Sequence, residues 1–157
     1  MNISITYDIM APGEEKQVCD LVLRVFDQFV APDYAEEGVL EFKSNITPEQ
    51  LVERCIGGHD FLVARQADKI LGVIDIRQHH HISLFFVDAE FQNQEIGKVL
   101  FQKAIALCKE KVPELNRISV NASPFAVPIY KRLGFKETDK EQIKNGMRYQ
   151  PLSLDLT

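Results

Sequence analysis

The sequence predicts a single mixed α/β domain. Apolar residues recur at helical spacing in some segments, and in others they alternate with polar residues or run continuously over strand lengths. Taken in order, these segments read β-α-α-β-β-β-α-β-α-β-β. The chain of 157 residues is long enough for one core and contains no repeat, linker or low-complexity segment, so we expect one domain over residues 1–157.

The first third of the chain predicts one strand and two helices. Residues 3–7 alternate between apolar and polar side chains and indicate a short strand. Apolar residues at helical spacing over 18–29 predict an amphipathic helix. Residues 31–45 show no sustained period and are interpreted as loop with some helix. The stretch TPEQ at 47–50 is a capping box with proline at the first helical position, so a helix is expected from there to about residue 56.

The rest of the chain alternates strands with two further helices. Strands are expected at 61–65, 70–77, 80–87 and 117–121, and within 149–156. A core-facing stripe over 96–107 predicts a long helix, and 125–135 predicts a short helix that Gly134 ends. The pair Asn145-Gly146 indicates a hairpin turn ahead of the last strand.

Composition excludes several classes of function. The chain has 18 basic and 23 acidic side chains, a net charge of −5, and no basic cluster, so neither nucleic acid nor a membrane surface is an expected partner. No apolar run approaches the ~20 residues of a membrane span. The N-terminus lacks the pattern of a signal peptide, and we expect a cytoplasmic protein. Three cysteines without close spacing are expected to be buried, reduced thiols rather than disulfides or zinc ligands.

The stretch FQNQEIGKVL at 91–100 has the layout of a phosphate-binding turn. It follows the apolar run ISLFFV at 82–87 and passes through a short polar segment into an amphipathic helix. The first N–H groups of a helix lack intrahelical partners and the helix dipole adds positive potential, so such a turn can hold an anion. Gly97 permits close backbone approach and Lys98 adds a cation. Alone this pattern is weak, because many strand–turn–helix connections contain one glycine.

A second stretch, AVPIYKRLGF at 126–135, makes the pattern specific. Together the two resemble the Gcn5-related N-acetyltransferase (GNAT) superfamily. Its acetyl-CoA loop reads Gln/Arg-x-x-Gly-x-Gly/Ala, and its later helix reads Ala-x-x-x-Tyr-x-x-x-Gly-Phe. The matching residues are Gln92, Ile96 and Gly97 in the loop, and Ala126, Tyr130, Gly134 and Phe135 in the helix. The order of elements fits as well, so the resemblance covers nearly the whole chain.

The resemblance implies the GNAT fold, a central mixed, mostly antiparallel sheet flanked by helices. It implies an N-acetyltransferase that uses acetyl-CoA as co-substrate, without a metal, and in which a primary amine of a small molecule or peptide attacks directly in a ternary complex. None of the cysteines occupies a motif position, which disfavours an acyl-enzyme. The residues implied to bind the cofactor are Phe85, Phe86, Val87, Gln92, Asn93, Gln94, Glu95, Ile96, Gly97, Lys98, Asn121, Ser123 and Tyr130.

Two parts of this set act in different ways. The strand that contains residues 85–87 splays from its neighbour in this superfamily, so its main chain would pair with the pantetheine amides like an added strand. Phe85 and Phe86 are equally compatible with a place in the core. Asn121 or Ser123 would hydrogen-bond the cofactor or a bridging water, and a turn or helix-capping role is the alternative for both.

Tyr130 is expected to be the general acid, because a phenol within reach can protonate the departing CoA thiolate. The general base is less defined. The histone-acetylating branch of the superfamily carries a glutamate eleven residues before the loop glutamine, and His81 occupies that position here. A histidine with an ordinary pKa near 6.5 accepts a proton at pH 7. His79 and Asp75 are weaker candidates, and strand histidines that alternate faces leave at least one in solvent.

Glu95 departs from the family pattern, since it occupies the first loop glycine. Charge-assisted N–H bonds to phosphate contribute ~1.5–3 kcal/mol each, whereas an outward carboxylate costs about 1 kcal/mol per nearby phosphate charge. We therefore expect CoA binding weakened by about tenfold but not lost, provided that position 95 does not require a positive φ. Lys98, three residues on, is a candidate to draw the carboxylate away.

The acceptor is not identified by the sequence. In this fold the acceptor cleft lies near the segment after the first helix, where Phe29, Asp33 and Tyr34 are candidate substrate residues. The acidic and aromatic residues over 33–42 suit a cationic amine, although a solvated acidic loop is the alternative reading. A CoA-binding sensor or interaction module without turnover is the rival function. A homodimer is an expectation from family resemblance only.

Overall fold

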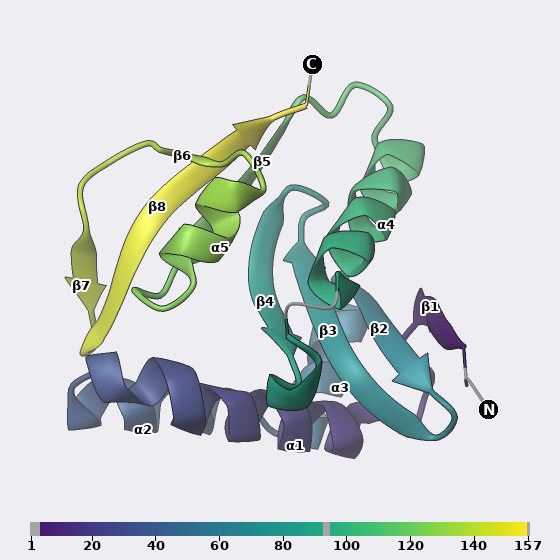
Figure 1. The fold of residues 1–157 in the computed structure, drawn as a ribbon, viewed down its shortest axis with the longest axis horizontal. Helices are drawn as coiled ribbons and strands as arrows, with labels where there is room; N and C mark the ends of the chain where they lie inside the picture. The colour runs from purple at the N-terminus through teal and green to yellow at the C-terminus, as the bar shows by residue number, and fades with distance from the viewer. Residues whose placement is uncertain (1–3, 93–94, 157) are drawn as a thin grey trace.

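The computed structural model describes residues 4–92 and 95–156 of the chain, and eight strands within them form one sheet (Figure 1). They are β1 (Ile5–Ile9), β2 (Asp60–Gln66), β3 (Lys69–Arg77), β4 (His81–Val87), β5 (Arg117–Ala122), β6 (Lys136–Glu137), β7 (Gln142–Lys144) and β8 (Met147–Asp155). The pairing order is β1-β2-β3-β4-β5-β8-β6, and β7 pairs with β8. The β4–β5 pair is parallel and the other pairs are antiparallel, which confirms the predicted mixed sheet.

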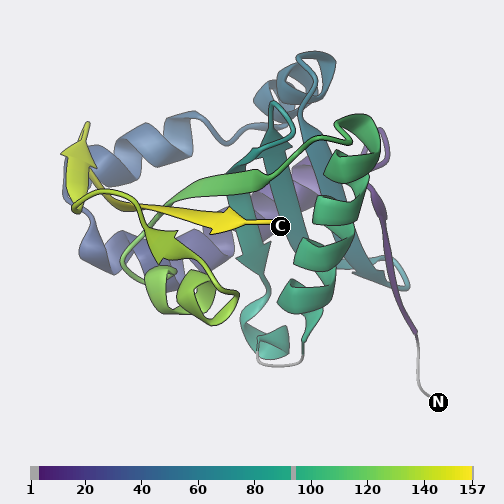
Figure 2. The same cartoon turned by 90° about the horizontal axis from the view of Figure 1, so that it is seen from above.

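Helices cover both faces of this sheet (Figure 2). They are α1 (Glu15–Val25), α2 (Glu36–Ser44), α3 (Pro48–Ile56), α4 (Ile96–Lys111) and α5 (Val127–Arg132). On one face α1 and α3 bury residues such as Val22 and Leu51 against β2, β3 and β4. On the other face α4 and α5 bury Leu100 and Tyr130. Two apolar cores therefore sandwich the sheet, and β4 contributes side chains to both.

The segment after α1 is more helical than its sequence predicts. The chain continues from α1 into a π-helical turn, η1 (Phe26–Val30), and a 3₁₀ turn, η2 (Ala31–Asp33), before α2 begins. Only Gly38 is buried among the residues of α2, so this helix does not need an apolar stripe. Without a stripe, its sequence gives a weak helix signal. The capping box after it is confirmed, since the Thr47 side chain accepts a hydrogen bond from the Gln50 amide.

The C-terminal hairpin is confirmed at Asn145 and Gly146, which have φ angles of 52° and 79° and join β7 to β8. Sequence patterning assigned no residues to β6 and β7, because strands of two and three residues are too short to show alternation. The predicted order nevertheless ends in two strands, and the predicted turn requires a strand before it. The hairpin turn lies directly against α2: a Cβ built on Gly38 would lie 2.1 Å from the Gly146 carbonyl oxygen. The two segments thus touch through backbone.

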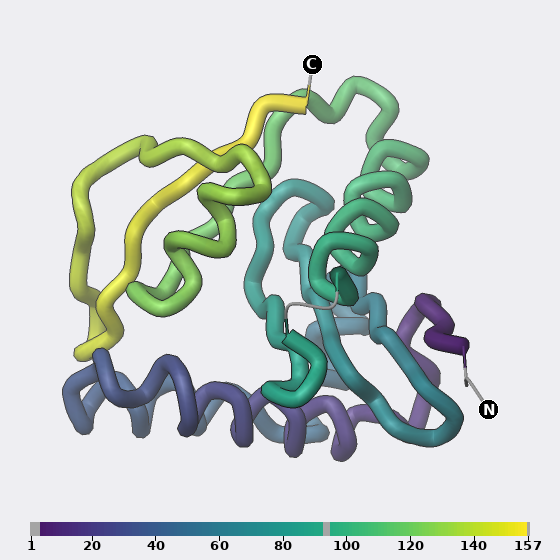
Figure 3. The backbone as a smooth tube through the Cα atoms, viewed as in Figure 1, coloured from purple at the N-terminus to yellow at the C-terminus, as the bar shows by residue number. Residues whose placement is uncertain are grey.

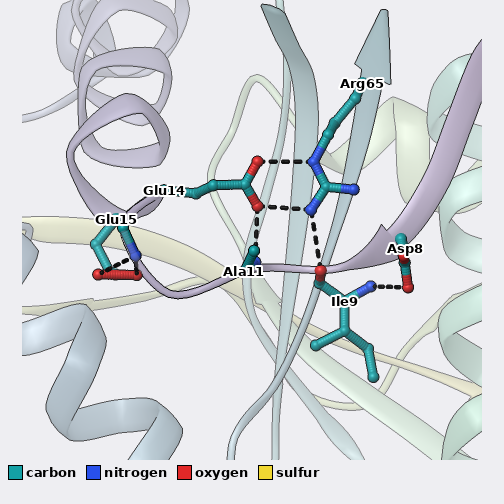
Figure 4. A network of polar contacts seen from close by, with 7 residues as sticks. Asp8, Ile9, Ala11, Glu14, Glu15 and Arg65 are labelled. Atoms are coloured by element: carbon teal, nitrogen blue, oxygen red, sulfur yellow. Dashed lines mark hydrogen bonds and ion pairs between the residues drawn. The ribbon is translucent and has the colours of Figure 1, made fainter. Parts of the chain in front are cut away.

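A partly buried ion pair fixes the start of α1 to the sheet (Figure 4). The Arg65 guanidinium of β2 donates two hydrogen bonds to the Glu14 carboxylate, at 2.7 and 2.6 Å, and a third to the Ile9 carbonyl of β1. Glu14 in turn accepts from the Ala11 amide. The Arg65 hydrogen bond lowers the pKa of Glu14. The Arg65–Glu14 pair therefore links β1, β2 and the N-terminal end of α1.

Two predictions about single residues need correction. His79 and His80 lie in the turn before β4, where His79 has a φ of 63°, so only His81 of the histidine triplet is in a strand. All three cysteines are free, but Cys55 on α3 is exposed whereas Cys19 and Cys108 are buried. Cys55 lies on the outer side of a surface helix, and a lone apolar residue there does not need a core. No helix among the described residues is long and apolar enough to cross a membrane.

Candidate active site

The site begins where two neighbouring strands separate. β4 and β5 pair in register only at His81–Ser119 and Ile82–Val120, and the remainder of β4 diverges from β5 toward the N-terminal end of α4 (Figures 1 and 3). On its other edge β4 stays paired with β3 as far as Val87. The splay that the resemblance implied is therefore present, and the edge of β4 from Ser83 onward borders an open cleft.

This cleft has a volume of about 790 Å³ and lies between β4, β5, α4 and α5, with α1 and α2 along its base. Most of the predicted site residues line it. They are Tyr34, Phe85, Phe86, Val87, Gln92, Glu95, Gly97, Lys98, Asn121, Ser123 and Tyr130. The two predicted motifs, in the turn before α4 and on α5, therefore line the same cavity.

Other predicted residues lie outside the cleft wall. Ile96 is buried in a small core cluster below β3. Phe29 does not line the cleft itself but stacks on Phe125, which does, with ring centroids 4.8 Å apart. Asp33 is exposed on η2. Asn93 and Gln94 fall outside the described residues.

The first turn of α4 borders the cleft, and N–H groups at a helix N-terminus have no intrahelical partners. No acidic residue lies in its first turn, and Gly97 and Lys98 line the cleft there. The Gln92 side chain turns back and donates to the Val87 carbonyl at 3.0 Å, which ties the turn to the end of β4. A Cβ on Gly97 would meet Phe85 and Val87 at 3.5 Å, an ordinary contact, so the glycine leaves space toward the cleft rather than avoiding a clash.

Glu95 has a φ of 64° and a left-handed conformation. The sequence expectation of CoA binding weakened by about tenfold assumed that position 95 does not need a positive φ, and the structure shows that it has one. Glycine adopts a positive φ freely, whereas glutamate adopts it at a cost of about 1–2 kcal/mol. The loop nevertheless keeps the geometry that a glycine would give, so the strain is already present in the free protein. Among the described residues, no ion pair joins Glu95 to Lys98.

A second anchor holds the chain before this turn. Asp88, buried at the end of β4, accepts a hydrogen bond at 2.9 Å from Arg24 of α1 and another from the Glu90 amide at 3.0 Å. Its own amide donates to the Leu71 carbonyl of β3. The short helix η3 (Ala89–Phe91) that leads into the turn is therefore fixed to both α1 and the sheet.

Tyr130 is 5% exposed and projects from α5 into the cleft wall between Phe85 and Phe135, whose ring centroids lie 6.0 and 5.2 Å away. Burial raises the pKa of its hydroxyl well above the ordinary value. No hydrogen bond joins this hydroxyl to another of the described residues. Among those residues no fully buried side-chain oxygen or nitrogen lacks a partner, so the hydroxyl oxygen keeps some accessible surface. It therefore remains a protonated donor at the edge of the cavity.

Comparison with known proteins decides the family. Residues 30–156 match the family described as acetyltransferase (GNAT) domain. An uncharacterized N-acetyltransferase from Chlorobaculum tepidum is 31% identical over 71% of this chain and 68% of its own length. The chain belongs to the GNAT acetyltransferase family. Membership of this family and the name of this relative support acetyl transfer in general.

Solved structures agree with this GNAT assignment at the level of the fold. A GCN5-related N-acetyltransferase from Rhodopseudomonas palustris superposes with a TM-score of 0.83 at 17% identity, with 99% of each chain covered. The PaiA N-acetyltransferase from Thermoplasma acidophilum superposes with a TM-score of 0.81 at 16% identity, covering 97% of this chain and 99% of its own. That second structure contains coenzyme A.

None of the three base candidates lines the cleft of this GNAT protein. His81 donates or accepts through Nδ1 with the Ser119 hydroxyl at 2.8 Å, and burial lowers its pKa to about 4. His79 Nδ1 lies 2.7 Å from Asp60. Asp75 is buried between Arg54 and His59, each at 2.8 Å, and burial raises its pKa. The described part of the cleft wall contains one carboxylate, Glu95.

Asn121 and Ser123 both line the cleft at the end of β5. The Ser123 hydroxyl accepts a long 3.4 Å hydrogen bond from the Ala126 amide, and its carbonyl accepts from the same amide at 2.9 Å. Ser123 therefore has the turn role that the sequence left open, while Asn121 remains exposed toward the cavity.

Sequence reasoning missed several residues of the cleft wall. Arg132 of α5 faces the cavity two residues after Tyr130, inside a motif whose intervening positions carry no family signal. Val25, Val30, Ser83, Phe125 and Gln102 also line it. They come from separate segments, and only the folded chain brings them together. The acidic residues expected near the acceptor lie elsewhere: none of the carboxylates over 33–41 lines the cleft.

Proposed function

We propose that this GNAT protein transfers the acetyl group of acetyl-CoA to a primary amine of a small molecule or peptide, by direct attack in a ternary complex. The observation that carries the proposal is that one cleft contains the N-terminus of α4, the diverging edge of β4 and the side chain of Tyr130. These three features suit, in order, a phosphate, a chain of amides and a departing thiolate.

The pyrophosphate would bind at the first-turn amides of α4, with Lys98 and Arg132 as cations in the same cavity. The pantetheine arm would extend along β4 from Val87 toward Ser83, because main-chain groups on that edge have no β5 partner. Gln92 holds the Val87 carbonyl, which fixes the end of this edge before the cofactor arrives.

In the reaction the neutral amine attacks the thioester carbonyl, a C–N bond forms, and the C–S bond breaks to leave a CoA thiolate. The proton that the amine loses and the proton that the thiolate gains balance overall. Tyr130 would supply the latter proton and regain one from solvent, into which the amine would release its own. Burial disfavours phenolate and thiolate alike, so a CoA thiol bound in the same apolar cavity would also have a raised pKa, which would offset the raised pKa of Tyr130.

A CoA-binding module without turnover is the second candidate. Two observations favour it: Glu95 carries a charge into the phosphate end of the cleft, and none of the described cleft residues is an evident base for the aminium. Tyr130 favours the enzyme instead, since a protein that only binds CoA needs no hydroxyl beside the thiol.

The test is release of the CoA thiol from acetyl-CoA in the presence of a panel of primary amines. We expect turnover by the wild type and a fall of about 10²-fold or more in kcat for Tyr130→Phe, with the acetyl-CoA KM little changed. Tyr149→Phe is the matched control, because the Tyr149 hydroxyl bonds Gln142 outside the cleft. Binding of acetyl-CoA without turnover on any amine would favour the non-catalytic module.

A further inference from the structure

The cleft has two sides, which face opposite surfaces of the sheet. Successive side chains of a strand point to opposite faces, so Phe85 and Phe86 of β4 separate. Phe85 packs toward α4 and α5, with ring centroids 6.4 Å from Phe101 and 6.0 Å from Tyr130. Phe86 packs toward α2, with its ring centroid 6.0 Å from Phe42. The cleft reaches both sides because β4 and β5 diverge.

If acetyl-CoA occupies the α4–α5 side, as the proposed function has it, the opposite side is left for the acceptor. We call it the acceptor-side wall and define it as Val25, Val30, Tyr34, Phe42, Phe86 and Phe125. Two of its rings pack on a neighbouring aromatic side chain. Phe42 stacks on the buried Phe26 with centroids 4.0 Å apart, and Tyr34 meets the same ring edge-on at 5.6 Å.

The acceptor-side wall contains no charged residue. The charged residues that line the described cleft are Glu95, Lys98 and Arg132, from the turn before α4, from α4 itself and from α5. A second ammonium group on the acceptor would therefore be removed from water without a carboxylate partner, which is unfavourable. Polyamines and aminoglycosides do not suit this wall.

The same apolar surroundings assist the reaction. Removing an aminium from water disfavours its charged form, so a larger share of the amine is the neutral nucleophile. This effect compensates in part for the lack of a carboxylate base beside the reacting centre.

We propose that the acceptor is a primary amine that carries a single amino group on an aryl or extended alkyl body, and that this body lies on the acceptor-side wall between Phe42 and Phe125. The inference rests on the proposed function for its choice of side. It assigns the specificity to contact area with apolar side chains rather than to ion pairing.

A homologous amine series tests this directly. The affinities of n-butylamine through n-octylamine, 2-phenylethylamine and spermidine are measured by calorimetry on the CoA-loaded protein, alongside acetyl transfer to each. Burial of each added methylene should tighten binding, and raise kcat/KM, by about fourfold until the wall is filled. We expect 2-phenylethylamine to bind at least tenfold more tightly than spermidine.

Phe125→Ala should reduce the affinity for 2-phenylethylamine by about tenfold and flatten the chain-length series. Leu40→Ala, which removes a 64% exposed apolar side chain from α2 outside the cleft, should leave both unchanged. Should Phe125→Ala fail to fold, the chain-length slope of the wild type decides alone.

The outcomes separate the two proposals. A flat series, or preference for spermidine, overturns the inference even where acetyl transfer occurs. A fourfold slope in binding without transfer supports the acceptor-side wall and overturns the proposed activity. No measurable binding of any alkyl or aryl amine to the CoA-loaded protein overturns the inference.

Discussion

Glu95 imposes two separate costs, one on folding and one on cofactor binding. Its left-handed backbone belongs to a position at which glycine is unstrained, and its carboxylate lines the end of the cleft where phosphate is expected. Because the free protein already has the glycine-like backbone, the conformational cost lowers stability. The charge alone opposes the anion.

Two variants separate these costs. Glu95→Gly should raise the free energy of unfolding by about 1 kcal/mol, or Tm by about 2–4 °C, and tighten acetyl-CoA binding by about tenfold. Glu95→Gln should tighten binding to a similar extent but leave Tm unchanged, since it keeps the side chain and removes the charge. Thermal unfolding and calorimetric titration measure both. Equal binding by wild type and Glu95→Gln would contradict the electrostatic account.

His81 is a neutral residue of the sheet at physiological pH. Burial holds its pKa near 4 in the folded protein, against about 6.5 when unfolded. Between pH 6.5 and 4, His81 binds a proton in the unfolded chain but not in the folded protein. Stability from this group is therefore fully present above pH 6.5 and is lost as pH falls toward 4.

His81→Asn should remove that dependence, because asparagine can bond the Ser119 hydroxyl without titrating. We expect the wild type to lose about 1–2 kcal/mol more than the variant between pH 6.5 and 4 in denaturant unfolding, because solvent screens the part-exposed ring. We also expect the pH profile of kcat/KM to be the same for the wild type and His81→Asn, because no inflection near pH 6.5 should come from His81. An inflection that disappears in the variant would restore His81 as the base.

At the scale of elements, the contact between α2 and the β7–β8 turn positions the acceptor side of the cleft. α2 carries Phe42 into the acceptor-side wall, and Gly38 brings its backbone against Gly146. Sequence patterning predicted the turn but only some helix within 31–45, because a helix fixed by a glycine contact has no apolar stripe. The contact joins residues more than a hundred positions apart in the chain.

Gly38→Ala tests this contact by the sign of its effect. In an ordinary helix interior the change stabilises by ~1 kcal/mol, since alanine is the better helix former. Here its Cβ would lie 2.1 Å from the Gly146 carbonyl oxygen, so the two segments must separate, and we expect a net loss of about 1–3 kcal/mol. Leu40→Ala, at a 64% exposed position of the same helix, should change stability by less than ~0.5 kcal/mol. A stabilised Gly38→Ala protein would show that the two elements do not depend on each other.

At the scale of the whole molecule, the sequence predicted the fold class and the central parts of the cleft. Long periodic segments such as α1 and α4, and the motif residues Gln92, Gly97 and Tyr130, could be placed because pattern and spacing act locally. The cleft wall beyond them could not. Arg132, Phe125 and the rest of the acceptor-side wall come from separate segments that only the topology brings together.

The central claim is that CoA binds along the open edge of β4 and at the N-terminus of α4. Amide hydrogen exchange, measured by mass spectrometry with and without saturating acetyl-CoA, tests it most directly. The account predicts that peptides covering 83–92 and 95–100 exchange severalfold more slowly with the ligand, while peptides from β2, already paired on both edges, do not change. Ligand saturation without slower exchange in those two regions would contradict it.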